Sequence, residues 1–314
     1  MTTAEHALLA RLDHPDASER QLAAMALEDV VSPGAVTSLI AALGDPDATV
    51  RRLVVGLLEE LGDGRAAPAL IAALGDPDPA VRAAAETALR ELRDDAAAGA
   101  LLAAVGHADP FVRRAVLVAL RELRDPRATD ALVAALEDPV ADVRREAVVT
   151  LAYLRTPVAI PGFRRRLGDE DAGVRRLAVG ALELFHGPAL LPSFIGALRD
   201  PDWQVRAEAA IVLGRTALSQ AVPALLEALE DPAWQVRKEA ALALGRLRAP
   251  AAIPALLRLL DAAVPDLRRV AAAALGELRA RDATGALDRL RLTDEDVEVK
   301  KAAARALAAI EGVQ

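Results

Sequence analysis

The sequence contains no cysteine and few aromatic residues, and each shortage excludes a class of protein. The lack of cysteine excludes disulfides, thiolate catalysis and cysteine-based metal sites. Aromatic residues make up 2% of the 314 residues, although the hydrophobic class as a whole reaches 53%. Because β-sheets draw heavily on β-branched and aromatic side chains, this composition disfavours a β-sandwich or β-barrel. We expect a core of alanine, leucine and valine.

Long apolar runs and an excess of positive charge are also missing. The longest stretch without a charged residue runs from Val30 to Gly44, which is shorter than the roughly 20 residues that cross a bilayer. The first residues, from Met1 to His6, lack the basic-then-apolar order of a signal peptide. We therefore expect a soluble cytoplasmic protein. The net charge of −8 argues against general coating of a nucleic acid.

The most prominent feature of the sequence is a repeat. A Val-Arg pair recurs every 31 residues from Val50-Arg51 to Val236-Arg237. Related pairs extend the series back to Glu19-Arg20 and forward to Val299-Lys300, the last after a step of 32. Such periodicity is typical of stacked repeat proteins, so we predict one solenoid domain over residues 1–314. Its ten predicted units span residues 3–31, 32–62, 63–93, 94–124, 125–155, 156–186, 187–217, 218–248, 249–279 and 280–314.

Each unit is predicted to contain two antiparallel helices. In the unit 63–93, Leu70 and Leu74 mark the apolar stripe of a short first helix, and Asp78-Pro79 is a start signal for a second helix. Because neither helix buries its apolar face alone, the units must stack on one another. We therefore predict an all-α, right-handed α-solenoid. Glycines at the end of the first helix are expected to form left-handed C-caps, at Gly44, Gly75, Gly106 and Gly168.

Two strings carry a family resemblance. The segments from Asp76 to Arg82 (DPDPAVR) and from Ala221 to Leu229 (AVPALLEAL) resemble the HEAT-like repeat of the phycobilin-lyase type, and the resemblance covers the whole chain. It implies a ladder along the stack, in which an arginine fork holds a carboxylate or turn carbonyls of the next unit. His14 and His107 stand where this ladder expects an aspartate. The implied aspartates are Asp45, Asp76, Asp138, Asp169, Asp200 and Asp231.

The sequence shows no recognisable catalytic or cofactor motif. Its four histidines, at positions 6, 14, 107 and 186, do not have the spacing of a zinc protease. We find no phosphate-binding glycine loop and no Gly-x-Ser-x-Gly nucleophile elbow. We therefore predict no catalytic residue, no metal site and no cofactor, and we do not expect an enzyme acting alone.

The second helices are expected to line the concave wall of the solenoid. Positions one, five and nine after the ladder arginine then face solvent. In units four to eight these positions combine apolar side chains with arginine around the only tyrosine, a composition typical of binding hot spots. Alternatively, neighbouring units cover the apolar members and Gly180 relieves packing. The predicted site consists of Arg114, Val118, Arg145, Val149, Tyr153, Arg176, Gly180, Leu184, Ile211, Arg215, Lys238, Leu242 and Arg246.

The two tryptophans lie one repeat apart. Trp203 and Trp234 each start a predicted second helix, in the strings DWQVR and AWQVR. We expect them along one edge of the stack, where they either pack against the edge or offer a stacking surface to a partner.

Three functions remain open at this point. The first is a non-catalytic scaffold, expected to be a monomer, that binds a protein or peptide with acidic groups and an apolar anchor. The second, implied by the family resemblance, is a bilin-lyase-type subunit that acts on a tetrapyrrole and a phycobiliprotein. The third is a helical-repeat protein that binds nucleic acid, which the acidic net charge opposes. No membrane partner is expected.

Overall fold

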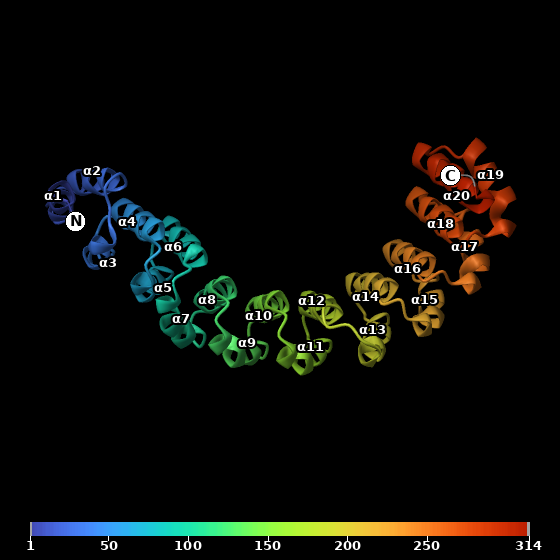
Figure 1. The fold of residues 1–314 in the computed structure, drawn as a ribbon, viewed down its shortest axis with the longest axis horizontal. Coiled ribbons are helices and arrows are strands. Elements are labelled where there is room, and N and C mark those ends of the chain that lie inside the picture. The colour runs from blue at the N-terminus through green and yellow to red at the C-terminus, as the bar shows by residue number, and fades with distance from the viewer. Residues whose placement is uncertain (1, 313–314) are drawn as a thin grey trace. The chain divides into compact units, whose positions relative to one another are not determined.

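The computed structural model describes residues 2–312, and within them the chain forms 20 α-helices and no β-strand (Figure 1). The predicted all-α solenoid class is thereby confirmed. The chain divides into two compact units, unit 1 (Met1–Ala159) and unit 2 (Ile160–Gln314), which we describe separately. That residues 1–314 form one solenoid domain stays a prediction.

Each unit consists of helix pairs. In unit 1 the first helices of the pairs are α1 (Thr3–Arg11), α3 (Val36–Ala42), α5 (Ala67–Ala73), α7 (Ala98–Ala104) and α9 (Thr129–Ala135). The second helices of unit 1 are α2 (Ala17–Leu27), α4 (Ala48–Leu61), α6 (Pro79–Glu91), α8 (Pro110–Leu123) and α10 (Ala141–Leu154).

Unit 2 continues the same alternation. Its first helices are α11 (Ile160–Arg166), α13 (Leu191–Ala197), α15 (Val222–Ala228), α17 (Ile253–Leu259) and α19 (Thr284–Thr293). Its second helices are α12 (Ala172–Glu183), α14 (Trp203–Arg215), α16 (Trp234–Arg246), α18 (Pro265–Glu277) and α20 (Val297–Glu311). Short 3-10 helices precede the first helices from α3 onward, beginning with η1 (Pro33–Ala35) and ending with η9 (Arg281–Ala283).

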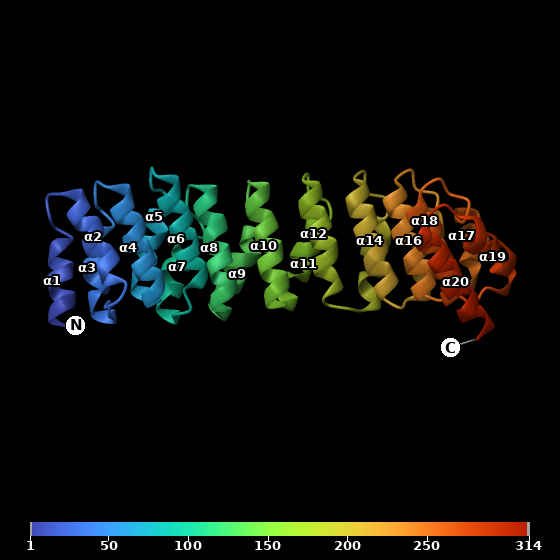
Figure 2. The same cartoon turned by 90° about the horizontal axis from the view of Figure 1, so that it is seen from above.

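Within each unit the helices form two layers, one of first helices and one of second helices (Figures 1 and 2). The second helices pack against one another more extensively than the first helices do. A leucine column lies at the centre of this packing, and nine of its members are fully buried. The column consists of Leu27, Leu58, Leu89, Leu120, Leu151, Leu182, Leu213, Leu244, Leu275 and Leu307.

Aspartate side chains start most second helices. The carboxylate of Asp78, for example, accepts hydrogen bonds from the backbone N–H groups of Ala80 and Val81 at 2.8 and 3.2 Å. This satisfies N–H groups that have no partner inside the helix, and such caps stabilise a helix by about 1 kcal/mol. Three second helices lack the side-chain cap because Val140, Ala233 and Val264 occupy the position. Equivalent aspartate caps are Asp16, Asp47, Asp109, Asp171, Asp202 and Asp296.

The prediction of left-handed glycine caps after the first helices is wrong. Among the described residues, positive φ angles of glycine occur only at Gly62, Gly187 and Gly312, so Gly44, Gly75, Gly106 and Gly168 are not left-handed. The first helix ends instead in a tight turn that needs no such residue, with the Gly75 N–H donating to the Ala72 carbonyl at 3.0 Å. The left-handed position recurs at the end of the second helices, at Gly62, Arg124, Arg155, His186, Ala217, Arg248 and Arg279.

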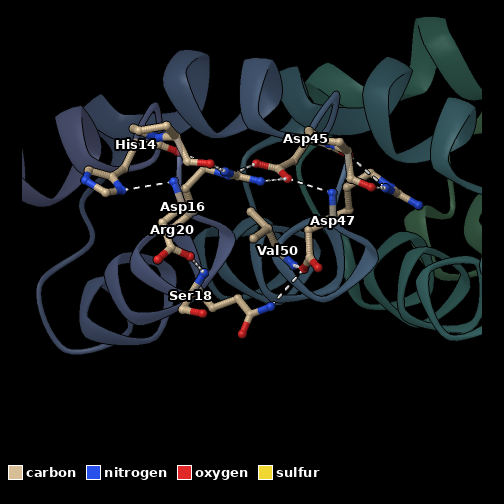
Figure 3. Close-up of polar contacts among 11 residues, drawn as sticks. His14, Asp16, Ser18, Arg20, Asp45, Asp47 and Val50 are labelled. Carbon is tan, nitrogen blue, oxygen red and sulfur yellow. Dashed lines mark hydrogen bonds and ion pairs between the residues drawn. The ribbon is translucent and has the colours of Figure 1, made fainter.

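The predicted arginine ladder is present within both units. The Arg20 guanidinium donates from Nε and Nη2 to the two carboxylate oxygens of Asp45 in the next repeat, at 2.6 and 2.9 Å (Figure 3). Its Nη1 donates to the carbonyls of His14 and Pro15. These carbonyls belong to the arginine's own repeat, whereas the prediction placed them in the next repeat. Each ladder pair therefore joins one repeat to its neighbour with a planar, bidentate contact.

The histidines at the aspartate positions preserve one hydrogen bond of this turn. Nδ1 of His14 accepts a hydrogen bond from the Asp16 N–H at 3.1 Å, and Nδ1 of His107 accepts one from Asp109 at the same distance. In seven other turns an aspartate oxygen accepts this bond, as Asp45 does from Asp47 at 2.8 Å (Figure 3). The imidazole thus replaces the carboxylate as an acceptor for the turn.

Candidate functional site

Tyr153 is the most exposed aromatic side chain of the predicted site, with 46% of its surface accessible. It lies on α10 near two guanidinium groups of unit 1, since the Cζ atoms of Arg124 and Arg121 are 5.1 and 5.9 Å from the ring centroid. Arg124 also donates a hydrogen bond to the tyrosine hydroxyl. Cation–π contacts of this kind are attractive and help to hold the ring in place.

An ion-pair network supports Arg121. Its Nε and Nη1 atoms contact carboxylate oxygens of Glu122 and Glu146 at 3.1 and 3.0 Å. Burial raises the pKa of Glu146 above its ordinary value, although the positive charges of Arg121 and Arg114 oppose that shift. The two acidic groups therefore fix the Arg121 guanidinium beside the tyrosine ring.

The other predicted site residues of unit 1 contribute less exposed surface. Arg114 forms an ion pair with Glu86 at 2.6 Å, and Arg145 pairs with Asp142 at 2.6 Å. Val149 is half-buried. The prediction that Val118 faces solvent is wrong, because only 8% of this residue is exposed. Neighbouring helices cover its short branched side chain. At this position the alternative prediction, in which adjacent repeats bury the apolar residue, is therefore correct.

In unit 2 the predicted site contains two arginines that lack a carboxylate partner. Arg176 on α12 and Arg246 on α16 are exposed, and neither forms an ion pair within the described part of the chain. Arg215 on α14 pairs instead with Glu183 at 3.1 Å. The uncompensated guanidiniums leave this face with donors that an acidic partner can use.

The apolar members of unit 2 are all partly accessible. Leu184, Ile211 and Leu242 are half-buried on the second helices or directly after them. Gly180 lies beside Glu208, and a Cβ atom added at this glycine would be 3.4 Å from Glu208 Oε1. The expected notch at Gly180 is therefore bordered by a carboxylate, which sequence reasoning did not include in the site.

Glu208 is half-buried, and burial raises its pKa above the ordinary value. The nearby charge of Arg176 acts in the opposite direction, while Glu183 adds to the increase. Among the described residues Glu208 has no hydrogen-bond or ion-pair partner. Its position two residues after a ladder arginine gave no sequence signal, because this column holds mostly apolar residues.

The two tryptophans occupy the first turns of α14 and α16. Trp203 is 39% exposed, whereas Trp234 is half-buried. The Lys238 ammonium lies 5.9 Å from the centroid of the Trp234 ring and 3.5 Å from a Glu239 carboxylate oxygen. Of the pair, Trp203 is therefore the better stacking surface.

The predicted site thus appears in two parts, one in each unit. Unit 1 carries Arg114, Val118, Arg145, Val149 and Tyr153, and unit 2 carries the remaining members and the tryptophans. We call the exposed side of the second helices in each unit the second-helix face. Sequence reasoning missed Arg121, Arg124 and Glu208, because they lie outside the three solvent-facing columns that were considered.

Clusters of metal-ligating side chains and membrane-spanning helices are both absent from residues 2–312. No group of three histidine, aspartate or glutamate side chains in this range is arranged to hold a metal ion. In the same range, no helix combines the length and hydropathy that a membrane-spanning segment requires.

Comparison with solved structures identifies the fold. An engineered protein matches at 22% identity with a TM-score of 0.50, and the match covers 99% of both chains. YibA of Escherichia coli matches at 21% identity with a TM-score of 0.62, over 83% of this chain and 98% of that one. A Kap95p chain crystallised with RanGDP matches at 16% identity with a TM-score of 0.68, over 99% of this chain but 50% of that one.

Comparison with models of protein families shows to which family the chain belongs. No curated protein matches the sequence at a significant level. The family model for HEAT repeats matches residues 5–90, 67–151, 132–200 and 191–273, which together cover most of the chain. The narrower resemblance to the phycobilin-lyase type of repeat stays a prediction. On the strength of these matches and of the helix pairs described above, the chain belongs to the HEAT-repeat family.

Proposed function

We propose that this protein is a non-catalytic scaffold that binds a protein or peptide on its second-helix face. The observation that carries the proposal is the combination of exposed, uncompensated arginines with half-buried apolar side chains on that face. In unit 2 these are Arg176 and Arg246 beside Ile211 and Leu242. Such a surface suits a partner with acidic groups and an aliphatic or aromatic anchor.

The structural neighbours support this class of function. The matched Kap95p chains were crystallised with RanGDP and with Nup1, so those proteins bind other proteins. Their similarity to this chain is at the level of the fold, because identity is 16%. From these proteins we infer for this chain only that a HEAT-repeat array can serve as a protein-binding surface.

The charge pairing favours a protein partner over a nucleic acid. Several members of the basic column directly after the ladder arginines are compensated, since Arg114, Arg145 and Arg269 pair with Glu86, Asp142 and Asp266. A surface that follows a phosphate backbone needs a continuous row of available positive charges. The paired column offers isolated ones, which match single acidic side chains better.

A peptide selection tests the proposal with the full chain. We expect peptides selected from a random display library to be enriched in acidic residues next to one large apolar residue. Their affinity, measured by fluorescence polarisation, is expected to fall about tenfold or more in Arg176→Glu, because a favourable charge contact becomes repulsive. Arg199→Glu is the matched control, because Arg199 is also exposed in unit 2 but follows first helix α13.

Tyr153→Ala supplies the corresponding test in unit 1. Removing the ring deletes an exposed aromatic surface of the kind that dominates binding energies. Circular dichroism is expected to remain unchanged, since the ring is 46% exposed. If the selected peptides bind Arg176→Glu and Tyr153→Ala as tightly as the parent, the second-helix face is not the binding surface.

A further inference from the structure

The ladder pairs of the two units share one geometry. In every complete pair the arginine Nε donates to one aspartate oxygen at 2.6 or 2.7 Å, and Nη2 donates to the other at 2.8 or 2.9 Å. Nη1 donates to two carbonyls of the arginine's own turn. The complete pairs are Arg20–Asp45, Arg51–Asp76, Arg113–Asp138, Arg175–Asp200, Arg206–Asp231 and Arg268–Asp294.

Arg237 of unit 2 has the arginine half of this arrangement without the carboxylate. Its Nη1 donates to the carbonyls of Asp231 and Pro232 at 2.6 and 3.1 Å, as in the complete pairs. The position of the missing aspartate is occupied by Ala262, which has no side-chain acceptor. Within the described residues, Nε and Nη2 of Arg237 therefore have no partner.

A cleft opens at this unfilled position. It has a volume of about 450 Å³ and lies between α15 and α17, with Arg237 in its wall. Ala255, Leu259 and Ala262 supply part of its apolar lining. Arg237 and Leu267, from the first turns of the second helices α16 and α18, also line it.

The acidic side chains near the cleft are already paired elsewhere. Glu230 accepts a hydrogen bond from Arg258 at 2.9 Å, and Asp261 accepts one from Arg289 at 2.9 Å. Neither of them replaces the missing partner of Arg237. The fork is thus held in its binding orientation by the two turn carbonyls but has free donors.

We propose that Arg237 is a binding site for a carboxylate group that comes from outside the repeat array. The incoming carboxylate occupies the place that an aspartate side chain fills in the six complete pairs. A planar guanidinium with two parallel donors matches a carboxylate in bidentate geometry, and its fixed orientation lowers the entropic cost of binding. The apolar wall formed by Ala255 and Leu259 accommodates the carbon atoms that carry the group.

A cleft in unit 1 provides the internal comparison. A space of about 710 Å³ between α1 and α3 is lined by Arg20 and Asp45. There the arginine fork is already saturated by Asp45 (Figure 3). The difference between the two clefts is thus the presence of an internal carboxylate, and an aspartate at position 262 is expected to convert the second into the first.

Titration with sodium acetate tests the site directly, with sodium chloride at equal ionic strength as the reference salt. The NMR signal of the Arg237 Nε–H is expected to move with acetate and not with chloride, because a new acceptor forms at that atom. In Ala262→Asp the same signal is expected to start at the position of the paired ladder arginines and to stay there. Ala251→Asp is the matched control, because Ala251 is exposed in the same repeat and adds the same charge outside the cleft lining.

Two peptides then distinguish the source of the carboxylate. One has a free C-terminus and no acidic side chain, and the other is amidated and contains a single aspartate. Ala262→Asp is expected to weaken whichever peptide binds by about tenfold or more, since it removes a charged bidentate hydrogen bond. Binding of the first assigns the site to a chain terminus, and binding of the second assigns it to an acidic side chain.

The proposal is overturned if acetate does not move the Arg237 signal, if neither peptide binds, or if Ala262→Asp binds as well as Ala251→Asp. These outcomes are independent of the second-helix face, because Arg176→Glu is expected to leave acetate binding at Arg237 unchanged.

Discussion

In unit 2 the second helices meet at glycines, whereas the same repeat position in unit 1 mostly carries long charged side chains. A Cβ atom added at Gly214 would lie 2.8 Å from the Cα atom of Ala243 on the neighbouring helix, and one at Gly276 would lie 2.8 Å from the Cα atom of Ala306. In unit 2 this position holds Gly214, Gly245 and Gly276 on α14, α16 and α18, but Glu183 on α12 and Ala308 on α20; the corresponding residues of unit 1 are Glu28, Glu59, Arg90, Arg121 and Ala152.

The difference shows two ways of joining the same repeats. In unit 2 the backbones of α14, α16, α18 and α20 approach closely, which increases dispersion contacts between them. In unit 1, Arg121 at this position reaches across to the next second helix, where it contacts Glu146 at 3.0 Å. A glycine inside a helix costs about 1 kcal/mol relative to alanine, so close packing must offset that cost in unit 2.

The largest difference in stability between the two units is expected when a glycine of the second helices is replaced by alanine. Gly214→Ala is expected to lower the free energy of unfolding by about 1–3 kcal/mol, because the new Cβ overlaps the Ala243 backbone. In unit 1, Gly56→Ala on α4 has nothing within 4 Å of the added Cβ, so it is expected to raise stability by up to about 1 kcal/mol. Chemical denaturation measures both, and equal effects would contradict the contact difference.

The left-handed residues that end the second helices give the next largest effect. Gly62 in unit 1 has a φ of 59°, and Ala217 occupies the equivalent position in unit 2 with a φ of 56°. Because only glycine adopts this conformation without strain, Ala217→Gly is expected to raise stability by about 1 kcal/mol and Gly62→Ala to lower it by about as much. Thermal unfolding that shows the same sign for both substitutions would be inconsistent with this geometry.

Acidic pH is expected to destabilise the ladder pairs of both units. The side-chain hydrogen bonds from Arg51 and Arg268 lower the pKa of Asp76 in unit 1 and of Asp294 in unit 2 below the ordinary 3.8. A lowered pKa means that the folded state binds protons less readily, so this stabilisation is present above pH 3.8 and is lost as the pH falls through the lowered pKa. Stability measured from pH 6 to pH 2 should therefore decrease. A smaller decrease is expected in Asp76→Asn, which no longer has a carboxyl group to titrate there.

The smallest effect concerns the two glutamates whose pKa is raised. Glu146 in unit 1 and Glu208 in unit 2 are both raised by burial, so the stability they contribute decreases as the pH rises from their unfolded pKa through their folded pKa. Glu208→Gln is expected to raise stability slightly at pH 7. Glu146→Gln is expected to gain less, because it loses the ion pair with Arg121. A larger gain at Glu146, measured by urea denaturation, would reverse this order.

The sequence was sufficient to predict those features that recur at a constant spacing. The leucine column, the aspartate caps and the ladder arginines each depend on contacts that every repeat makes in the same way, and the structure places them as the repeat indicates. The tight turn after the first helix was not predictable from Gly75 alone, because glycine fits a right-handed turn as well as a left-handed one.

The candidate site was harder to predict, because exposure depends on how neighbouring helices cover each side chain. Val118 and Val149 occupy the same repeat position, yet Val118 is buried and Val149 is half-buried. The contacts of Tyr153 with Arg121 and Arg124 join two successive repeats and leave no pattern in either one. The unfilled position at Ala262 was not predicted, because only His14 and His107 were identified as departures from the aspartate column.

The uniform ladder geometry has a consequence for changes in chain length. Arg20 binds Asp45 and Arg51 binds Asp76 through the same two donors, Nε and Nη2, so either arginine offers the same contact to the repeat that follows it. Excising one whole period of 31 residues between equivalent turns would bring Arg20 to Asp76 in the register it now shares with Asp45. Arrays of this construction are modular at their joints, and they tolerate gain or loss of complete periods far better than a shift of a few residues.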